Sequence, residues 1–176
     1  HPVWIDPGQC FGTGHHISTS LALEMLEQFL FETDTFPESM LDIGIGSGIL
    51  AIAACRLGLN IVTGVDIEDE AVAEVEQNRE LNGLSGRING HVGQPSLLKK
   101  PALLVVSNML LSELLGIRHD LIRLTSPGGT LICSGLFGQQ SAELRNSLME
   151  LGFVYRASLG RENWNAIQFQ RLGKQS

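Results

Sequence analysis

The hydrophobic positions of this chain follow two periodicities in turn, which predicts alternating helices and strands. In the helical segments apolar residues recur three and four positions apart, whereas the strand segments are short apolar runs bounded by Gly, Asn and Asp. The expected strands cover residues 40–43, 60–66, 87–92, 102–106, 130–134, 153–159 and 164–171. The expected helices cover residues 21–30, behind the N-capping run Ser18-Thr19-Ser20, and 49–57, 68–81, 110–124 and 141–151.

The last two strands must form an antiparallel hairpin. Only the turn-like residues 160–163 separate them, and a parallel return needs a crossover of about a dozen residues or more. The earlier strands alternate with helices, as in a parallel sheet covered on both faces. The pattern therefore predicts an α/β fold, with an open, mostly parallel seven-stranded sheet, helices on both faces and a C-terminal antiparallel hairpin.

Composition narrows the classes of protein to which the chain can belong. Its 176 residues are 43% hydrophobic and 18% charged, which suits one globular domain. The formal net charge of −7 gives no broad basic surface, so we expect neither nucleic-acid nor membrane binding. Cys10, Cys55 and Cys133 are far apart and odd in number, which fits a reducing cytoplasm and not a disulfide framework. The longest apolar stretch, residues 49–55, is too short to span a bilayer.

A glycine-rich loop follows the first expected strand and is the main candidate for a binding site. In an open parallel sheet, ligands bind beyond the carboxyl ends of the strands. Gly44, Gly46 and Gly48 lie at such an end, where glycine lets the backbone turn sharply and approach a ligand closely. Asp66 closes the next strand, and a carboxylate there can accept hydrogen bonds from both hydroxyls of a ribose.

The glycine spacing distinguishes two classes of ligand. Dinucleotide-binding proteins use G-x-G-x-x-G, whereas this loop is G-x-G-x-G, with Ile49 after the third glycine and Asp42 two positions before the first. It also contains no basic residue to contact a phosphate. The pattern resembles the S-adenosylmethionine loop of the Rossmann-like methyltransferases, and the terminal hairpin is also typical of that superfamily. The expected cofactor is S-adenosyl-L-methionine, bound by Asp42, by the three glycines, and by Asp66 with its neighbour Ile67.

A longer motif near the start of the chain points to one family. Residues 6–19 resemble the D-P-G-x-x-F-G-T-G-T-H-x-T-T signature of the PrmA family, whose members methylate a large-subunit ribosomal protein. The likeness continues through residues 41–54, 64–67 and 78–83. It then includes Ser107-Asn108, residues 124–135 and Glu162-Asn-Trp164, so that it covers nearly the whole chain.

The resemblance implies roles for individual residues. Thr19, Gly44, Asp66 and Asn108 match the positions by which the family binds S-adenosylmethionine. Residues 1–20 are then a lid loop and helix start, in which Phe11 packs on the sulfonium side of the cofactor and Thr13 lines the acceptor side as a second catalytic residue. A metal site at His15 and His16 is not expected, because neighbouring side chains diverge and no carboxylate or thiol completes the set.

The resemblance also implies that Asn108 is the catalytic residue, because it ends the fourth strand, where many methyltransferases of amino groups carry Asn or Asp. Its amide oxygen can accept a hydrogen bond from an incoming amine and direct the nitrogen lone pair toward the methyl carbon. An asparagine that merely caps the turn is the competing interpretation. For Trp164, core packing and a place at the border of the acceptor pocket both remain open.

We therefore expect one methyltransferase domain over residues 1–176, with a Rossmann-like core at 39–172 and no counterpart of the family's N-terminal recognition domain. The expected reaction is methyl transfer to amino groups of a protein, on lysine side chains of a large-subunit ribosomal protein. A small-molecule N- or O-methyltransferase and a regulatory module that binds the cofactor without turnover remain as alternatives. A nicotinamide oxidoreductase is disfavoured by the glycine spacing. The expected location is the cytoplasm, and the oligomeric state is left open.

Overall fold

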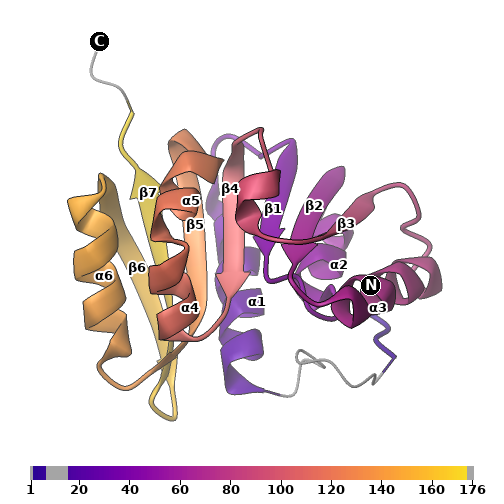
Figure 1. Cartoon of the computed structure of the whole chain (residues 1–176), viewed down its shortest axis with the longest axis horizontal. Coiled ribbons are helices and arrows are strands. Elements are labelled where there is room, and N and C mark those ends of the chain that lie inside the picture. Colours follow the sequence, from indigo (N-terminus) through magenta and orange to yellow (C-terminus); the bar gives the residue numbers. More distant parts are fainter. Residues whose placement is uncertain (1, 7–15, 174–176) are drawn as a thin grey trace.

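A computed structural model describes residues 2–6 and 16–173 of the chain (Figure 1). Its helices and strands alternate from α1 to β5, and the chain ends in α6 followed by a hairpin. The elements are α1 (Ile17–Glu32), β1 (Ser39–Ile43), α2 (Ile49–Arg56), β2 (Ile61–Asp66), α3 (Asp69–Leu81), β3 (Ile88–Val92), the 3₁₀ helix η1 (Pro95–Leu97), β4 (Ala102–Asn108), α4 (Leu111–Gly116), α5 (Arg118–Leu124), β5 (Thr125–Phe137), α6 (Gln140–Glu150), β6 (Phe153–Arg161) and β7 (Trp164–Arg171).

The strands form one seven-stranded sheet in the order β3-β2-β1-β4-β5-β7-β6. The first five strands are parallel to one another, and β7 pairs antiparallel with both β5 and β6. The predicted mostly parallel sheet with a terminal antiparallel hairpin is therefore confirmed. The strand order reverses between β1 and β4, and this is the switch point at which open α/β sheets bind ligands.

Helices cover both faces of the sheet and enclose two apolar cores. Figure 1 shows α4, α5 and α6 in front of the sheet, with α1 and α2 behind it. The rear core includes Met25 of α1, Ile52 of α2 and Val75 of α3, all buried. The front core includes Leu121 of α5 and Leu148 of α6, also buried. Because apolar burial is the main stabilising term in folding, these cores fix the strands whose ends carry the site.

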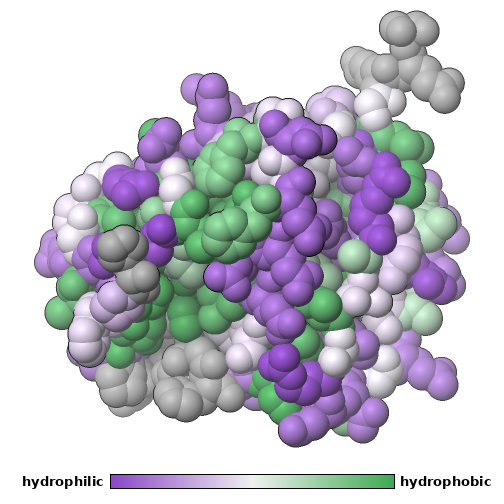
Figure 2. All heavy atoms as spheres, turned by 180° about the vertical axis from the view of Figure 1, so that it is seen from behind, coloured by the Kyte–Doolittle hydropathy of each residue, from purple (hydrophilic) through white to green (hydrophobic). Residues whose placement is uncertain are grey.

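The rear face is polar where α1 meets solvent. Figure 2 shows a hydrophilic band down the middle of this face, with hydrophobic surface beside it. The exposed positions of α1 include Glu27, Gln28 and Glu32, opposite its buried apolar stripe. No helix in the described part of the chain is both long and apolar enough to cross a bilayer.

Two predicted elements differ from the structure in extent. The single helix expected at 110–124 is two short helices, because Ile117 leaves the helical region (φ −103°, ψ 10°) just after Gly116, a weak helix former. The fifth strand is longer than expected and spans Thr125–Phe137. Residues 126–129 lie within that strand as an irregularity that shifts its register on β4.

The start of α1 corrects another prediction. His16, and not the run Ser18-Thr19-Ser20, is the N-cap, and its Nδ1 accepts a hydrogen bond from the backbone N–H of Ser18. Ser18 and Thr19 are buried inside the first turn of the helix. The Thr19 hydroxyl makes a tertiary contact with Asn108, whereas the Ser18 hydroxyl lies 2.8 Å from Nδ1 of His16.

Candidate functional site

The glycine loop joins β1 to α2 at the carboxyl edge of the sheet. Gly44, Gly46 and Gly48 all have positive φ values, of 74°, 51° and 80°. The backbone N–H groups of Gly44 and Ile45 both donate to the Val65 carbonyl, which fixes the loop against β2. A side chain on Gly44 would also place a Cβ 2.8 Å from the sulfur of Met109, so the loop requires glycine there for conformation and for space.

Asp66 holds the glycine loop and the start of α3 together. One carboxylate oxygen accepts from the Gly46 N–H at 3.0 Å, and the other accepts from the Glu68 N–H at 3.2 Å. The side chain is therefore fixed in position before any ligand binds. Each oxygen keeps further acceptor capacity, and Asp66 lines the pocket, as the predicted ribose contact requires.

Asp42 lies beneath the glycine loop and is almost completely buried. Burial raises the pKa of its carboxyl group well above the ordinary value, the negative charge of Asp66 raises it further, and the backbone amide of Ala51 opposes the shift. Within the described residues, neither oxygen has a well-formed hydrogen bond. Asp42 is therefore a costly group for a core, and this is typical of a functional site.

Asn108 ends β4 at the other side of the switch point. Its Nδ2 donates to the Thr19 hydroxyl at 3.2 Å, and its Oδ1 is buried with no hydrogen-bond partner among the described residues. Thr19 is held in place because the hydroxyl of Ser134 on β5 donates to the carbonyl of Ser18 at 2.7 Å. One half of the Asn108 amide is thus fixed, and the other half remains available as an acceptor.

Several of these groups, among them Gly44, Asp66 and Asn108, line one pocket with a volume of about 650 Å³, in the range of small-molecule sites. The carboxyl edge of the sheet forms the floor of the pocket, and the start of α1 and the α4–α5 turn contribute to its walls. Its charged lining residues are Asp66, Glu68 and Glu113, and no lysine or arginine is found among the described residues that line it. This field favours a cationic ligand over a pyrophosphate.

An aromatic group closes the end of the pocket near Asn108. Trp164 lies edge-to-face with His16, at 4.5 Å between ring centroids, and with Phe137 at 5.2 Å. Trp164 begins β7 directly after a turn in which Glu162 and Asn163 both adopt positive φ, as a two-residue hairpin of type I′ requires. It lines the pocket and also packs against the rear core, and its place at the acceptor remains a prediction.

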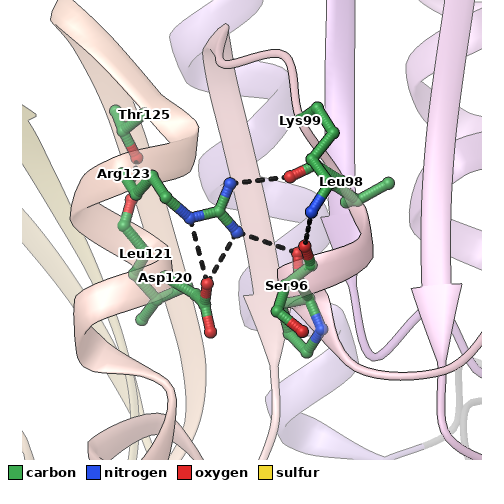
Figure 3. A network of polar contacts seen from close by, with 8 residues as sticks. Ser96, Leu98, Lys99, Asp120, Leu121, Arg123 and Thr125 are labelled. Atoms are coloured by element: carbon green, nitrogen blue, oxygen red, sulfur yellow. Dashed lines mark hydrogen bonds and ion pairs between the residues drawn. The ribbon is translucent and has the colours of Figure 1, made fainter.

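The segment after β3 forms the opposite wall of the pocket. Gly93, Gln94 and Pro95 line it, and the Gly93 N–H donates to the Asp66 carbonyl at 2.6 Å. Figure 3 shows how Arg123 of α5 holds the same segment. The Arg123 guanidinium donates to the Leu98 carbonyl at 2.6 Å and to the Pro95 carbonyl at 3.0 Å, and it pairs with Asp120 at 2.6 Å.

Most residues expected at the site meet there. The pocket lining includes Thr19, Gly44, Gly46, Asp66, Ile67 and Asn108. Gly48 instead starts α2 in a left-handed conformation, and Asp42 lies behind the lining. Phe11 and Thr13 lie outside the described residues. The contacts place these residues together, while their roles in binding or catalysis remain predictions.

Several lining residues were missed in the sequence. The segment 93–95 carried a usable signal, because it directly follows a parallel strand at the edge where the other site residues lie. Gly116 and Ile117 carried none, since the helix was expected to be continuous there. Arg123 lies on the same misjudged helix, and no motif marks it.

Comparison with known proteins adds independent information. Residues 2–172 match the sequence family described as "Ribosomal protein L11 methyltransferase (PrmA)". Two curated proteins named ribosomal protein L11 methyltransferase are each 36% identical, one from Exiguobacterium sibiricum over 170 residues and one from Trichlorobacter lovleyi over 172 residues. The matches cover 96% and 97% of this chain but only 53% and 56% of those proteins. The chain thus spans about half the length of the curated relatives that it matches.

Solved structures agree with this result. A ribosomal protein L11 methylase from Lactobacillus delbrueckii subsp. bulgaricus superposes with a TM-score of 0.85 and 30% identity, covering 97% of this chain and 84% of that one. Magnesium protoporphyrin IX methyltransferase from Synechocystis PCC 6803, solved with bound S-adenosylmethionine, has a TM-score of 0.72 at 18% identity, covering 86% of this chain and 78% of that one. At that identity the second likeness shows a shared fold and nothing more.

Proposed function

We propose, from the premise that this chain belongs to the ribosomal protein L11 methyltransferase (PrmA) family, that it transfers methyl groups from S-adenosylmethionine to amino groups of ribosomal protein L11. Lysine side chains are the proposed acceptors. The observation that carries the proposal is the buried Oδ1 of Asn108, which has no hydrogen-bond partner among residues 2–6 and 16–173, in a pocket that also contains the Asp66 carboxylate.

The residues present fit S-adenosylmethionine. Asp66 is held by backbone amides with its remaining acceptor capacity available, which suits the two ribose hydroxyls. Gly44 and Gly46 line the pocket without side chains, so that a ligand could approach the backbone of the loop. The acidic lining suits a ligand that carries a sulfonium and an ammonium group. When bound, the cofactor supplies an electrophilic methyl group.

Asn108 then orients the acceptor. Its Nδ2 is held by Thr19, so its Oδ1 can accept a hydrogen bond from an acceptor amine and direct the nitrogen lone pair. Positioning of this kind supplies a large part of the rate acceleration in a transfer between two bound reactants. Trp164 and His16 line the acceptor end and provide an apolar surface for the alkyl stem of a lysine.

The acceptor lysine must be neutral to react. From an ordinary pKa of ~10.4, deprotonation at pH 7 costs about 4.6 kcal/mol. Burial and the positive charge of the cofactor would lower that pKa and offset part of this cost. Glu113 is the carboxylate nearest to Asn108 in sequence, but it is exposed and accepts the Leu110 N–H at the start of α4. The proposed route for the proton is therefore to water.

The proposal extends to the domain organisation. Residues 39–172 form the proposed cofactor-binding core, and residues 1–20 are proposed as a lid loop and helix start, with Phe11 and Thr13 of the loop facing the cofactor and the acceptor. Because the curated relatives are about twice as long as the matched region, recognition of L11 is proposed to use residues that have no counterpart in this chain.

The decisive test is methyl transfer from labelled S-adenosylmethionine to purified, unmethylated L11, followed by mass spectrometry of the product. We expect label on lysine, and a rate that falls by at least about 100-fold in Asn108→Ala, in the range that lost positioning produces. Asn89→Ala, on an exposed part of β3, is the matched control and should retain the parent rate.

Two results would contradict the proposal. Label in a small-molecule fraction but not in L11, from the same reaction supplied with a cell extract, would indicate a small-molecule methyltransferase. Tight binding of S-adenosylhomocysteine with no label in any fraction would indicate that acceptor recognition needs residues outside this chain, or that the chain is a regulatory module.

A further inference from the structure

Two buried asparagines on α3 hold the start of the chain as a neighbouring β-strand would. The Oδ1 of Asn82 accepts from the backbone N–H of Trp4 at 3.0 Å, and its Nδ2 donates to the Trp4 carbonyl at 2.6 Å. One side-chain amide thus satisfies both backbone groups of one residue, as in a hydrogen-bonded pair of antiparallel strands. Asn82 is 4% exposed, so its side of this pairing is shielded from water, whereas Trp4 is exposed.

Asn78 makes the second contact and extends it to the glycine loop. Its Oδ1 accepts from the Asp6 N–H at 2.9 Å, and its Nδ2 donates to the carbonyl of Ser47 at 2.9 Å. Asn78 is 1% exposed. Ser47 lies between Gly46 and Gly48, so a single buried amide bridges the segment at residues 3–6 and the loop at the centre of the pocket.

The spacing of the two asparagines matches an extended chain. Positions four apart on a helix are separated by ~6 Å along its axis, and two residues of a strand span ~6.6 Å. Asn78 and Asn82 can therefore pair with Asp6 and Trp4 in register. Val3 and Ile5 alternate with these residues and pack against the rear core, as in a strand with one buried face.

We propose that Asn78 and Asn82 are positioning residues that couple docking of the segment at residues 3–6 to cofactor binding at the glycine loop. A cofactor that orders the loop around Ser47 also fixes the amide of Asn78, and that amide holds Asp6. By linkage, each event then strengthens the other by the same factor. This inference rests on the proposed function for the identity of the ligand, and on the geometry of α3 for the docking.

The test measures docking and binding separately in the whole chain. Amide hydrogen exchange at Trp4 and Asp6 is followed by NMR, with and without S-adenosylhomocysteine as the probe, and the affinity for the probe is measured by calorimetry. One neutral hydrogen bond contributes ~1 kcal/mol, which corresponds to about fivefold in an equilibrium constant. We expect the probe to slow exchange of both amides about fivefold, and Asn82→Ala to weaken probe binding about fivefold.

The choice of variant keeps the test sharp. Asn82→Ala removes both contacts to Trp4 and the bond from Asn82 Nδ2 to the Asn78 carbonyl, and it leaves the bond from Asn78 to Ser47 intact. A loss of affinity is therefore assigned to the segment only when exchange at the Trp4 amide becomes faster in the same variant. Asn78→Ala should weaken binding more, because it also removes the bond from Asn78 to the Ser47 carbonyl. Asn89→Ala, exposed on β3, is the control and should match the parent in both measurements.

The coupling would be disproved by exchange rates that the probe leaves unchanged, or by an Asn82→Ala protein that binds the probe as tightly as the parent. A parent that binds no probe would instead overturn the proposed function together with the coupling. Docking of the segment is still tested in that case, because the Trp4 amide must exchange faster in Asn82→Ala than in the parent even without the probe. Equal rates would show that the asparagines do not hold the segment.

Discussion

The amide nitrogen of Asn108 lies 3.2 Å from the hydroxyl oxygen of Thr19, although 89 positions separate the two residues in the chain. This contact joins the end of β4 to the first turn of α1. It leaves the Oδ1 of Asn108 as the unpartnered half of the amide in the described structure. The orientation of the proposed catalytic group therefore depends on a helix that precedes the whole sheet.

Thr19→Val should disturb that orientation with little change in shape. Loss of the accepting hydroxyl frees the Asn108 amide to rotate, and a positioning hydrogen bond of 1–2 kcal/mol corresponds to a fall in kcat of about 5- to 30-fold. Steady-state kinetics with L11, together with calorimetry for the cofactor, would separate the two effects. Thr130→Val, a buried threonine of β5 outside the pocket lining, should retain the parent kcat. Weaker cofactor binding with an unchanged kcat would mean that Thr19 acts on the cofactor and not through Asn108.

Asp42→Asn should stabilise the cofactor-free protein, most clearly at neutral and higher pH. Burial and the charge of Asp66 raise the pKa of Asp42 in the folded state, so the folded protein holds a proton that the unfolded chain loses above pH ~3.9. The contribution of the protonated carboxyl to stability is complete below that pH and is lost as the pH rises through the folded-state pKa. Asparagine is neutral throughout and avoids this loss.

The measurement is thermal unfolding of the parent and Asp42→Asn between pH 4 and 8. The melting temperature of the variant should exceed that of the parent by about 3 °C or more at the upper end, and the gap should narrow toward pH 4. Asp34→Asn, on an exposed position, should show no such trend. A gap that stays constant with pH would mean that ionisation of Asp42 is not its cause.

Gly135→Ala should damage the turn that carries Asn108. Gly135 has φ +90°, and a Cβ there would lie 2.3 Å from the Met109 carbonyl oxygen, next to Asn108 in the chain. Backbone strain and collision together should lower the free energy of unfolding by about 3 kcal/mol or more, and kcat should fall as the turn shifts. Gly138→Ala is the matched control, because Gly138 also has positive φ (57°) but has open space around it. Its cost should be about 1–2 kcal/mol, from conformation alone. If both variants lose the same free energy of unfolding in urea, the backbone around Met109 must move aside without cost.

The parts of the site that could be predicted from sequence are those fixed by local chain geometry. Gly44 and Asp66 follow directly from the strands that they end, because parallel strands bring their carboxyl ends to one edge. The contact between Thr19 and Asn108 could not be predicted in this way, because it depends on how α1 packs across β5 and β7. The capping role expected for Ser18 and Thr19 failed for the same reason. Local preference allowed it, but His16 caps the helix and tertiary contacts use Thr19 in the pocket and the Ser18 carbonyl at β5.

Arg123 should affect cofactor affinity from outside the pocket. Its guanidinium donates hydrogen bonds to the carbonyls of Pro95 and Leu98 (Figure 3). It thereby holds the pocket wall that follows β3, and Asp66 lies between this wall and Asn108. If Asp66 binds the ribose and Asn108 lies at the methyl end, the adenine must face this wall. Arg123→Met keeps the apolar stem but loses both hydrogen bonds, and should weaken binding of S-adenosylhomocysteine about 5- to 10-fold, with kcat at saturation nearly unchanged.

Calorimetry with S-adenosylhomocysteine and with methylthioadenosine, which lacks the amino-acid part, would locate the effect. Both ligands carry the adenine, so both should lose affinity by a similar factor. Arg118→Met is the control, since Arg118 donates only to the nearby Leu115 carbonyl and does not reach the wall. If kcat falls while the affinity is unchanged, Arg123 acts by stabilising α4 and α5, next to Asn108, and not by holding the adenine wall.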